Sequence, residues 1–341
     1  MQLVVHAGMH KTGSSSIQET FSKLSHPGIS YAPFESSNHS GVFKFITYDF
    51  DDESDLRKIG NSSLTREKLD RLKLENTRIF RKFLENSEGT GIFSAESISN
   101  PGSERHIETF AKIIESHNVP TKVIIYVRAP RSHMESAFQQ MVKEGRLGRL
   151  YPSRLWPKYR ARIDALDAAF GRNNVTVRAF QPENFLDGNV VRDFADFVGC
   201  KIESADIVRT NESISAEALA LTFLEQNAKP SDRSNSTQEN AKFIDRISSI
   251  GNSRLRFSDS LMAPILEENS EDLTWIESRV GHRLQESEPK NPIEISSESD
   301  LIELGVAQFD RLRMNLIGQI CGMTGEKKDM SLQLLNFLRK I

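Results

Sequence analysis

Short runs of β-branched and other apolar residues alternate, along the first half of the chain, with longer segments whose apolar positions recur every three to four residues. The strand-like runs are residues 3 to 7, 91 to 95, 122 to 127 and 175 to 180. The helix-like segments are residues 15 to 24, 104 to 117 and 159 to 171. Strands that alternate with helices build parallel sheets covered on both faces. We therefore predict an α/β fold, with three layers around a mainly parallel central sheet.

Beyond residue 190 the strand-like runs fade and helical spacing dominates. Helices are predicted over residues 190 to 199, 215 to 228, 240 to 250 and 300 to 320. A further helix over residues 64 to 83, polar on one side, is expected over the sheet edge or near the site as a cap. The polar stretches 229 to 240 and 285 to 300 are interpreted as loops. We predict an α/β core over residues 1 to 225 and an α-helical C-terminal part over residues 226 to 341, either packed on the core or within one single domain.

Composition narrows the class of protein without changing the predicted fold. The 341 residues include 44 Lys and Arg against 47 Asp and Glu, a formal net charge of −3, which gives no overall bias toward nucleic acids. Cys200 and Cys321 are too few for a disulfide framework and have no zinc-ligand spacing. No segment has the apolar length of a membrane span, and the first residues lack the features of a secretory leader. We expect a cytoplasmic protein without a metal.

The turn after the first strand has glycines at phosphate-loop spacing. Residues 6 to 16 read HAGMHKTGSSS, with Gly8 and Gly13 in the pattern GxxxxG, but Ser14 stands where a Walker loop has lysine. Such a strand-to-helix turn directs backbone N–H groups and the positive helix end at one place. An ordinary capped helix would show the same serines. Lys11, inside the loop, favours a donor with a short anionic chain, because its charge suits the oxygen that bridges to the transferred group.

A second strand-to-helix transition carries an arginine. Residues 123 to 140 read VIIYVRAPRSHMESAFQQ, with Arg128 at the strand end, Pro130 in the first helical turn and Ser136 eight residues after the arginine. An Arg fork beside a hydroxyl recognises phosphate, although either residue alone is typical of a sheet edge or a helix surface. Together, the two transitions predict two anion sites at the carboxyl ends of parallel strands, and hence a nucleotide with phosphates at two positions.

These two motifs resemble those of the sulfotransferase family, whose donor is 3′-phosphoadenosine 5′-phosphosulfate (PAPS). MHKTGSSS resembles the family's 5′-phosphosulfate loop, which commonly reads Lys-Ser-Gly-Thr-Thr, and VRAPRSHMES resembles its 3′-phosphate motif, an Arg with a Ser eight residues later. Residues 159 to 185, 188 to 199 and 211 to 215 are similar to the later strand, helix and following segment of bacterial members. The resemblance covers residues 1 to 225, with both phosphate motifs in the family's order.

The resemblance implies roles for residues of both motifs. Lys11 would bind the 5′-phosphosulfate and stabilise the leaving-group oxygen, while Arg128 and Ser136 would hold the 3′-phosphate. The family's Gly-rich basic loop over the adenine has no counterpart in this sequence. PAPS is the implied co-substrate and 3′,5′-bisphosphoadenosine (PAP) its product, with no metal. The remaining groups that would bind the 5′-phosphosulfate are the backbone and hydroxyls of Thr12, Gly13, Ser14, Ser15 and Ser16.

Sulfuryl transfer to a hydroxyl needs a group that takes the acceptor's proton. In the family this is a His or a Glu, often at the end of the strand before the 3′-phosphate strand, and Glu96 follows residues 91 to 95 at that point. Glu96 is therefore the first candidate for the base; a helix cap or a partner for Lys11 is the alternative interpretation. Two histidines compete with it. His10 could face the sulfuryl group, and His39, in SSNHSG, could line the acceptor pocket.

One strongly basic stretch, residues 143 to 162, interleaves arginines and lysine with aromatic residues. Arg forks and aromatic faces suit glycans that carry carboxylate or phosphate, so Arg146 and Trp156 are predicted to bind the acceptor. A solvated helix face or a subunit contact would show the same pattern. Neither the particular acceptor nor the oligomeric state follows from the sequence.

The sequence thus predicts an enzyme, a PAPS-dependent sulfotransferase. It would act by in-line displacement on a hydroxyl of a carbohydrate, glycan or glycolipid, with Glu96 as base and Lys11 at the leaving group. Two alternatives stay open: a P-loop kinase or NTPase, which the missing Walker lysine disfavours, and a non-catalytic nucleotide-binding module.

Overall fold

The computed structural model describes residues 1–59, 64–146, 149–209, 214–227 and 237–321, together with Asp329 and Leu332. Residues 211 to 213 of the predicted NESIS segment and residues 229 to 236 of the first polar stretch lie outside this range. Contacts divide the chain into two compact units. The sequence predicts one boundary, at residue 225, between an α/β core and a helical C-terminal part. The two units are divided differently, since each of them is assembled from three separate segments of the chain. Unit 1 comprises Met1–Ala129, Pro157–Asn211 and Ser270–Gln285, and unit 2 comprises Pro130–Trp156, Glu212–Asn269 and Glu286–Ile341.

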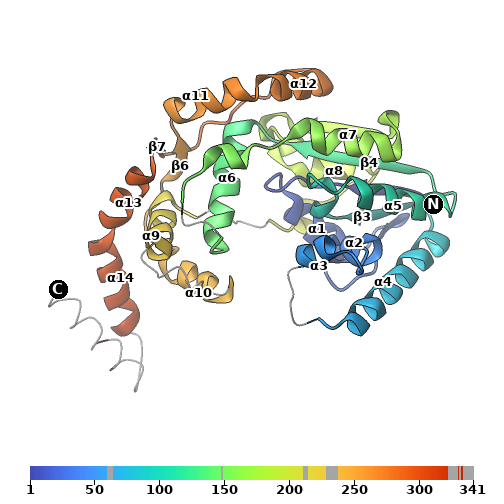
Figure 1. Cartoon of the computed structure of the whole chain (residues 1–341), viewed down its shortest axis with the longest axis horizontal. Helices are drawn as coiled ribbons and strands as arrows, with labels where there is room; N and C mark the ends of the chain where they lie inside the picture. The colour runs from blue at the N-terminus through green and yellow to red at the C-terminus, as the bar shows by residue number, and fades with distance from the viewer. Residues whose placement is uncertain are drawn as a thin grey trace. The chain divides into compact units, whose positions relative to one another are not determined.

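Unit 1 is built on a sheet of five strands, all parallel, in the order β2-β3-β1-β4-β5 (Figure 1). The strands are β1 (Gln2–His6), β2 (Ile29–Tyr31), β3 (Thr90–Ser94), β4 (Thr121–Val127) and β5 (Val175–Ala179). The four predicted runs are β1, β3, β4 and β5, and the predicted α/β class is confirmed. The sequence does not predict β2, because three residues are too few to show a pattern. The carboxyl ends of β3 and β4 lie on either side of the carboxyl end of the central strand β1. Open parallel sheets bind their ligands at this edge.

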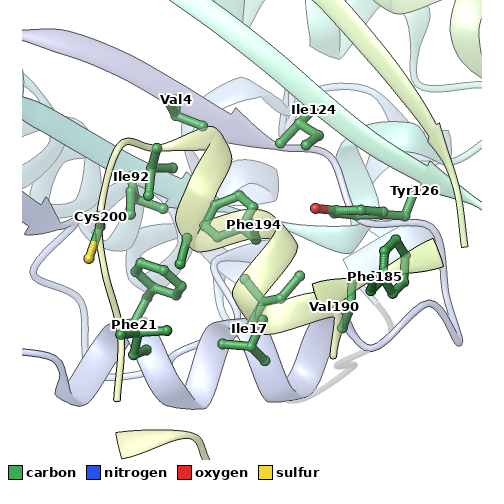
Figure 2. Packing of buried hydrophobic residues seen from close by; sticks show 14 residues of the cluster. Val4, Ile17, Phe21, Ile92, Ile124, Tyr126, Phe185, Val190, Phe194 and Cys200 are labelled. Carbon is green, nitrogen blue, oxygen red and sulfur yellow. The ribbon is translucent and has the colours of Figure 1, made fainter. Parts of the chain in front are cut away.

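Two helices, α1 and α8, cover one face of this sheet. Ile17 and Phe21 of α1 pack with Phe194 of α8 against Val4 and Ile124 of the strands, and Figure 2 shows these side chains gathered between the helices and the sheet. The rings of Phe21 and Phe194 meet edge to face, with centroids 5.0 Å apart. The loop from β1 to α1 is therefore anchored at both ends. The helices of unit 1 in the described ranges are α1 (Ser14–Lys23), α2 (Ser40–Thr47), α3 (Glu53–Ile59), α4 (Arg66–Asn86), α5 (Glu104–Glu115), α7 (Tyr159–Phe170), α8 (Val190–Phe197) and α12 (Ser270–Val280).

Aromatic side chains from α2, α4 and α5 cover the opposite face. Successive strand residues point to opposite sides, so Ile92 faces α1 and α8 while Phe93 faces this second layer. The ring centroid of Phe93 lies 5.2 Å from that of Phe80 in α4 and 5.0 Å from that of Phe110 in α5. Phe110 in turn contacts Phe43 of α2 at 5.5 Å. The polar helix predicted in this region is α4, and its C-terminal end packs into the core.

Unit 2 is mostly helical, as predicted for the C-terminal part, but it also contains two short parallel strands. Phe138 joins its elements, with ring contacts to Phe223 at 6.0 Å and to Phe257 at 5.8 Å. The sequence analysis misses both strands, and one of them lies in the stretch 285 to 300 interpreted as a loop. Four residues in which charged and apolar side chains alternate are too few to stand out. The elements are α6 (Pro130–Lys143), α9 (Ala216–Asn227), α10 (Thr237–Ile247), β6 (Arg254–Phe257), α11 (Asp259–Glu268), β7 (Pro292–Ile295), α13 (Glu298–Val306) and α14 (Phe309–Cys321).

Of the helices that the structure describes, none has the combination of length and apolar character needed to cross a membrane.

His39, just before α2, lies in the core of unit 1. Its ring is fully buried among Tyr31, Phe34 and Phe93, at centroid distances of 4.8, 5.3 and 4.7 Å. The backbone N–H of Ser94 donates to Nδ1 of His39 at 3.2 Å, so Nε2 carries the proton of a neutral ring. Burial lowers the pKa of His39 from 6.5 to about 4.

The buried ring of His39 makes the stability of the protein pH-dependent. Below its ordinary pKa the unfolded chain takes up a proton at His39 that the folded chain refuses, so stability is lost as the pH falls from about 6.5 toward 4. In His39→Asn an amide oxygen can accept the Ser94 N–H without titrating. Between pH 7 and pH 5, the variant should lose about 2 kcal/mol less unfolding free energy than the wild type. Urea unfolding at the two pH values measures this, and an identical pH dependence of both proteins would refute it.

Candidate functional site

The loop from β1 to α1 folds closely over the end of β1. A Cβ on Gly8 would lie 2.5 Å from Oγ of Ser14 and 3.2 Å from Cε1 of His6. Gly13 has a φ of 76°, and a Cβ there would lie 2.6 Å from Cγ1 of Val190. These close contacts and the positive φ explain why glycine stands at both ends of the predicted GxxxxG pattern. Gly8 permits the close approach of the loop to α1, and Gly13 makes the left-handed turn that opens the helix.

Hydroxyl groups inside this loop stabilise the loop itself. Thr12 Oγ1 donates to the carbonyl oxygen of Met9 at 2.7 Å, and Ser14 Oγ donates to the same oxygen at 3.3 Å. Both side chains are buried. An anion would therefore meet mainly the first backbone N–H groups of α1, which have no acceptor within a helix. Ser15 and Ser16, half-buried in the first turn of α1, complete the predicted set.

The tight turn at Gly13 gives a stability prediction. Gly13→Ala should lower the unfolding free energy by about 2–3 kcal/mol, because alanine is strained at positive φ and its Cβ clashes with Val190. Gly102→Ala is the matched control: Gly102 has a φ of 81° but open space around its Cβ position. The control should lose only the strain, about 1 kcal/mol. Denaturant unfolding of both variants tests this, and equal losses would contradict the close approach to Val190.

Lys11 and Arg128 bring two positive charges to the loop. Lys11 has a φ of 68°, which is uncommon for a residue with a side chain. Its carbonyl oxygen accepts a hydrogen bond from Nη1 of Arg128 at 3.2 Å, and the Arg128 guanidinium lies over the ring of Phe180 at 5.9 Å. The sequence assigned Arg128 to a second anion site, whereas the structure places its guanidinium against the first loop. Ser136, its predicted partner, belongs to α6 of unit 2.

Two of the candidate proton acceptors, Glu96 and His10, contact each other. Glu96 opens a short 3₁₀ helix, Glu96–Ser99, immediately after β3. Its Oε2 lies 3.0 Å from Nδ1 of His10. The side chain of Glu96 is 16% exposed and that of His10 is 51% exposed, so the carboxylate lies behind a more accessible imidazole. A carboxylate and an imidazole at this distance can orient each other and share a proton.

A chain of contacts that the sequence does not predict connects Glu96–Ser99 to the loop. Ser99 Oγ donates to the carbonyl oxygen of Gly8 at 3.2 Å, and the Ser99 carbonyl accepts from Nη1 of Arg162 at 2.7 Å. Arg162 Nε also donates to the carbonyl oxygen of Pro157 at 2.5 Å. Burial lowers the pKa of Arg162 to about 10, which leaves it charged at neutral pH. In the sequence analysis Arg162 belongs only to the basic stretch. Its contact with Ser99, 63 positions away, could not be predicted because no local pattern connects residues so far apart.

The predicted acceptor-binding residues lie in different surroundings. The full burial of His39 within the core of unit 1 gives no support to a place in a pocket wall. In unit 2, Trp156 is 6% exposed, whereas the Arg146 side chain is exposed and ion-paired with Glu144.

Within unit 1 the candidate site combines a loop that opens a helix N-terminus with side chains that can take a proton. The N-terminal end of α1, Lys11 and Arg128 supply positive potential, and Glu96 and His10, in contact with each other, are groups of the kind that can accept a proton. Among the described residues, no group of three or more His, Cys, Asp and Glu side chains could hold a metal ion. The arrangement suits transfer of a charged group from an anionic donor to a hydroxyl.

No protein-family model and no curated protein sequence matches the chain. Among solved structures, the crystal structure of a sulfotransferase from Alicyclobacillus acidocaldarius is similar to it, with 16% sequence identity and a TM-score of 0.44 over 83% of this chain and 97% of that chain.

Proposed function

We propose that the protein is a sulfotransferase that moves the sulfuryl group of PAPS to a hydroxyl of a carbohydrate or glycoconjugate. The observation that carries this proposal is the position of Lys11. It lies inside the loop rather than after the second glycine, and its carbonyl oxygen accepts a hydrogen bond from Arg128. The phosphate loop that the chain resembles in the sulfotransferase family also has an early lysine.

The place of the cation favours a phosphosulfate over a nucleoside triphosphate. A Walker lysine follows the second glycine and reaches the β- and γ-phosphates. Ser14 stands at that position and is buried, with its hydroxyl bonded to the carbonyl of Met9. Lys11, three positions earlier, suits the oxygen between the 5′-phosphate and the sulfuryl group. The compact turn at Gly8 and Gly13 leads directly into α1, whose first backbone N–H groups would bind phosphate oxygens in this proposal.

The proposed reaction is a single displacement at sulfur. The acceptor oxygen forms a bond to sulfur while the bond from sulfur to the bridging oxygen breaks, and the electron pair stays on that oxygen in the 5′-phosphate of PAP. Lys11 would neutralise the developing charge, and the N–H groups of α1 would bind the phosphate oxygens. Arg128 would hold the backbone of Lys11 in its left-handed conformation.

The acceptor's proton goes to Glu96 in this proposal. The contact with His10 holds the carboxylate in place, and the more exposed imidazole lies on the solvent side, from which an acceptor would approach. Ser99 and Arg162 position the short helix of Glu96 relative to Gly8. Proton transfer by a held group of this kind contributes about 10²–10⁴-fold to rate.

A carbohydrate acceptor is supported by the basic and aromatic stretch alone. In unit 2, Tyr151 is 41% exposed and the Arg154 guanidinium lies 4.9 Å from its ring centroid. A sugar face packs on an exposed aromatic ring, and an Arg fork binds a glycan carboxylate or phosphate. An acceptor screen with labelled PAPS, read by mass spectrometry for a sulfate adduct, identifies the acceptor class.

Thermal stability in the presence of nucleotides tests the proposed donor. A ligand at a hundred times its Kd adds about 2.7 kcal/mol to stability. PAP should therefore raise the melting temperature by several degrees, whereas ATP with magnesium should raise it much less. If ATP with magnesium raises the melting temperature as much as PAP does, the result contradicts PAPS as the donor and supports the kinase alternative.

A further inference from the structure

Three polar side chains meet in the core of unit 1. They belong to His6, the last residue of β1, Ser94, the last residue of β3, and Gln18 of α1. Nδ1 of His6 lies at hydrogen-bond distance, 2.8 Å, from Oγ of Ser94, and Nε2 of Gln18 donates to the same oxygen at 3.1 Å. His6 and Ser94 are fully buried and Gln18 is 2% exposed. These three side chains, called the Ser94 network below, are therefore joined out of contact with solvent.

The surroundings of the Ser94 network are apolar. His6 and Ser94 are neighbours in the parallel register of β1 and β3, on the side of the sheet that Ile92 also faces. The ring centroid of His6 lies 5.3 Å from that of Phe194, which Figure 2 shows within the apolar cluster. Burial lowers the pKa of His6 to about 4, and the charge of Glu96 opposes this shift. The imidazole is therefore neutral at neutral pH.

Packing alone does not favour a network of this kind. Nε2 of His6 is buried and has no hydrogen-bond partner among the residues that the structure describes. An unpaired polar atom in the core lowers stability, and apolar side chains of similar volume would avoid that loss. Local departures from good packing chemistry are concentrated at functional sites. What a buried polar network adds is rigidity, because its hydrogen bonds favour one arrangement of the elements that they join.

The elements that are joined here lie on both sides of the candidate site. Cε1 of His6 lies 3.2 Å from the position that a Cβ on Gly8 would take, so the ring packs against the start of the loop. The backbone N–H of Ala95 donates to the carbonyl oxygen of His6 at 3.0 Å, and Ser99 Oγ donates to that of Gly8 at 3.2 Å. Glu96 lies in the chain between these two contacts. The start of the loop and the segment that carries Glu96 are therefore held together.

Gln18 brings α1 into the same network. It lies one helical turn after Ser14, the first residue of α1, whose Oγ is 2.5 Å from the Cβ position of Gly8. In the proposed function the first N–H groups of α1 would bind phosphate oxygens of the donor. One hydroxyl group, that of Ser94, thus connects the helix that would bind the donor with the strand that leads to Glu96.

We propose that the Ser94 network positions the base: it fixes the distance between Glu96 and the donor-binding start of α1. This inference rests on the proposed function and deepens it, because it assigns a role in the reaction to three buried residues. His6, Gln18 and Ser94 are positioning residues, since they act through Glu96 and α1. Loss of the network should displace the base from the acceptor's hydroxyl and leave the groups that would bind the donor in place.

Ser94→Ala removes the oxygen that joins the network and adds no bulk. The kcat of sulfuryl transfer should fall by about tenfold, because rate depends steeply on the placement of a catalytic group. The affinity for PAP, measured by calorimetry, should remain that of the wild type. Thr47→Val is the matched control, since it removes a buried hydroxyl of α2 that donates to the carbonyl oxygen of Phe43. The control should lower the melting temperature and leave kcat unchanged.

A double-mutant cycle with Glu96→Gln shows whether the network acts through Glu96. In the Glu96→Gln protein no base remains to be positioned, so the addition of Ser94→Ala should cause no further loss of kcat. Gln18→Met removes the other arm of the network with a side chain of similar length. It should reproduce the effect of Ser94→Ala on kcat, and it provides the same cycle if Ser94→Ala does not fold. Melting temperatures establish which variants are folded.

The possible results separate this inference from the proposed function. If the wild type transfers the sulfuryl group and both network variants have its kcat, the positioning role is refuted. Equal losses of kcat with and without Glu96→Gln refute an action through Glu96, and the same loss in Thr47→Val assigns the effect to destabilisation instead. Variants that lose affinity for PAP but keep kcat show a network that only supports the loop. If the wild type neither binds PAP nor transfers the group, the proposed function is wrong and this inference is overturned with it.

Discussion

Lys11→Ala is expected to lower the kcat of sulfuryl transfer by about 10²–10³-fold, the loss seen when one group that stabilises a developing oxyanion is removed. The reason is that Lys11 meets the bridging oxygen only as negative charge accumulates there. The affinity for PAP should fall much less than kcat, because the backbone N–H groups of α1 remain. Steady-state kinetics with PAPS, together with calorimetry for PAP, measures the two effects separately.

Two further lysine variants make this result specific. Lys23→Ala removes a lysine from the other end of α1, where its 64% exposed side chain pairs with Glu19, and it should leave kcat unchanged. Lys11→Arg keeps the charge and should retain more activity than Lys11→Ala. If Lys11→Ala weakens PAP binding but leaves kcat intact, Lys11 binds the ground state only and the assigned leaving-group role is wrong.

Glu96→Gln should lower kcat by about 10²–10⁴-fold, since an amide of the same shape cannot take the acceptor's proton. The hydrogen bond to His10 and the fold around Ser99 should persist, so the melting temperature should stay near that of the wild type. The measurement is kcat and kcat/KM across a range of pH, with PAPS saturating.

His10→Asn is the matched variant for the other half of this pair. It removes a partner that orients the carboxylate and should reduce kcat by a smaller factor than Glu96→Gln. Should His10→Asn prove the more damaging of the two, the imidazole is the base and Glu96 positions it. Glu96→Gln with an undiminished rate at every pH would remove Glu96 from the chemistry.

Local sequence pattern was sufficient for the parts of the fold that are local. Strands β1, β3, β4 and β5 stand out because each contains a short run rich in apolar and β-branched residues, and α7 ends where Gly171 can adopt a positive φ. The loop between β1 and α1 could be located from its two glycines. Gly8 and Gly13 stand there because the loop packs too closely against neighbouring segments for a larger residue. Strands of three or four residues, such as β2, carry too little pattern to be seen.

Contacts between distant segments could not be predicted in the same way. The sequence offered Glu96 and His10 as alternatives, and only the fold brings them to 3.0 Å. Arg128 was expected at a site of its own, but its side chain reaches back to the carbonyl of Lys11. His39 looked like a loop residue because its neighbours are polar, yet the ring fills a gap between aromatic side chains. Each of these depends on tertiary packing, which hydrophobic spacing does not encode.

A crystal structure of the complex with PAP tests the central claim most directly, because it locates the 5′-phosphate. The account predicts phosphate oxygens within hydrogen-bond distance of the backbone N–H groups at the start of α1, with Nζ of Lys11 at the oxygen that would bridge to sulfur. A 5′-phosphate bound elsewhere, with the loop of residues 8 to 13 making no contact to it, would contradict the account.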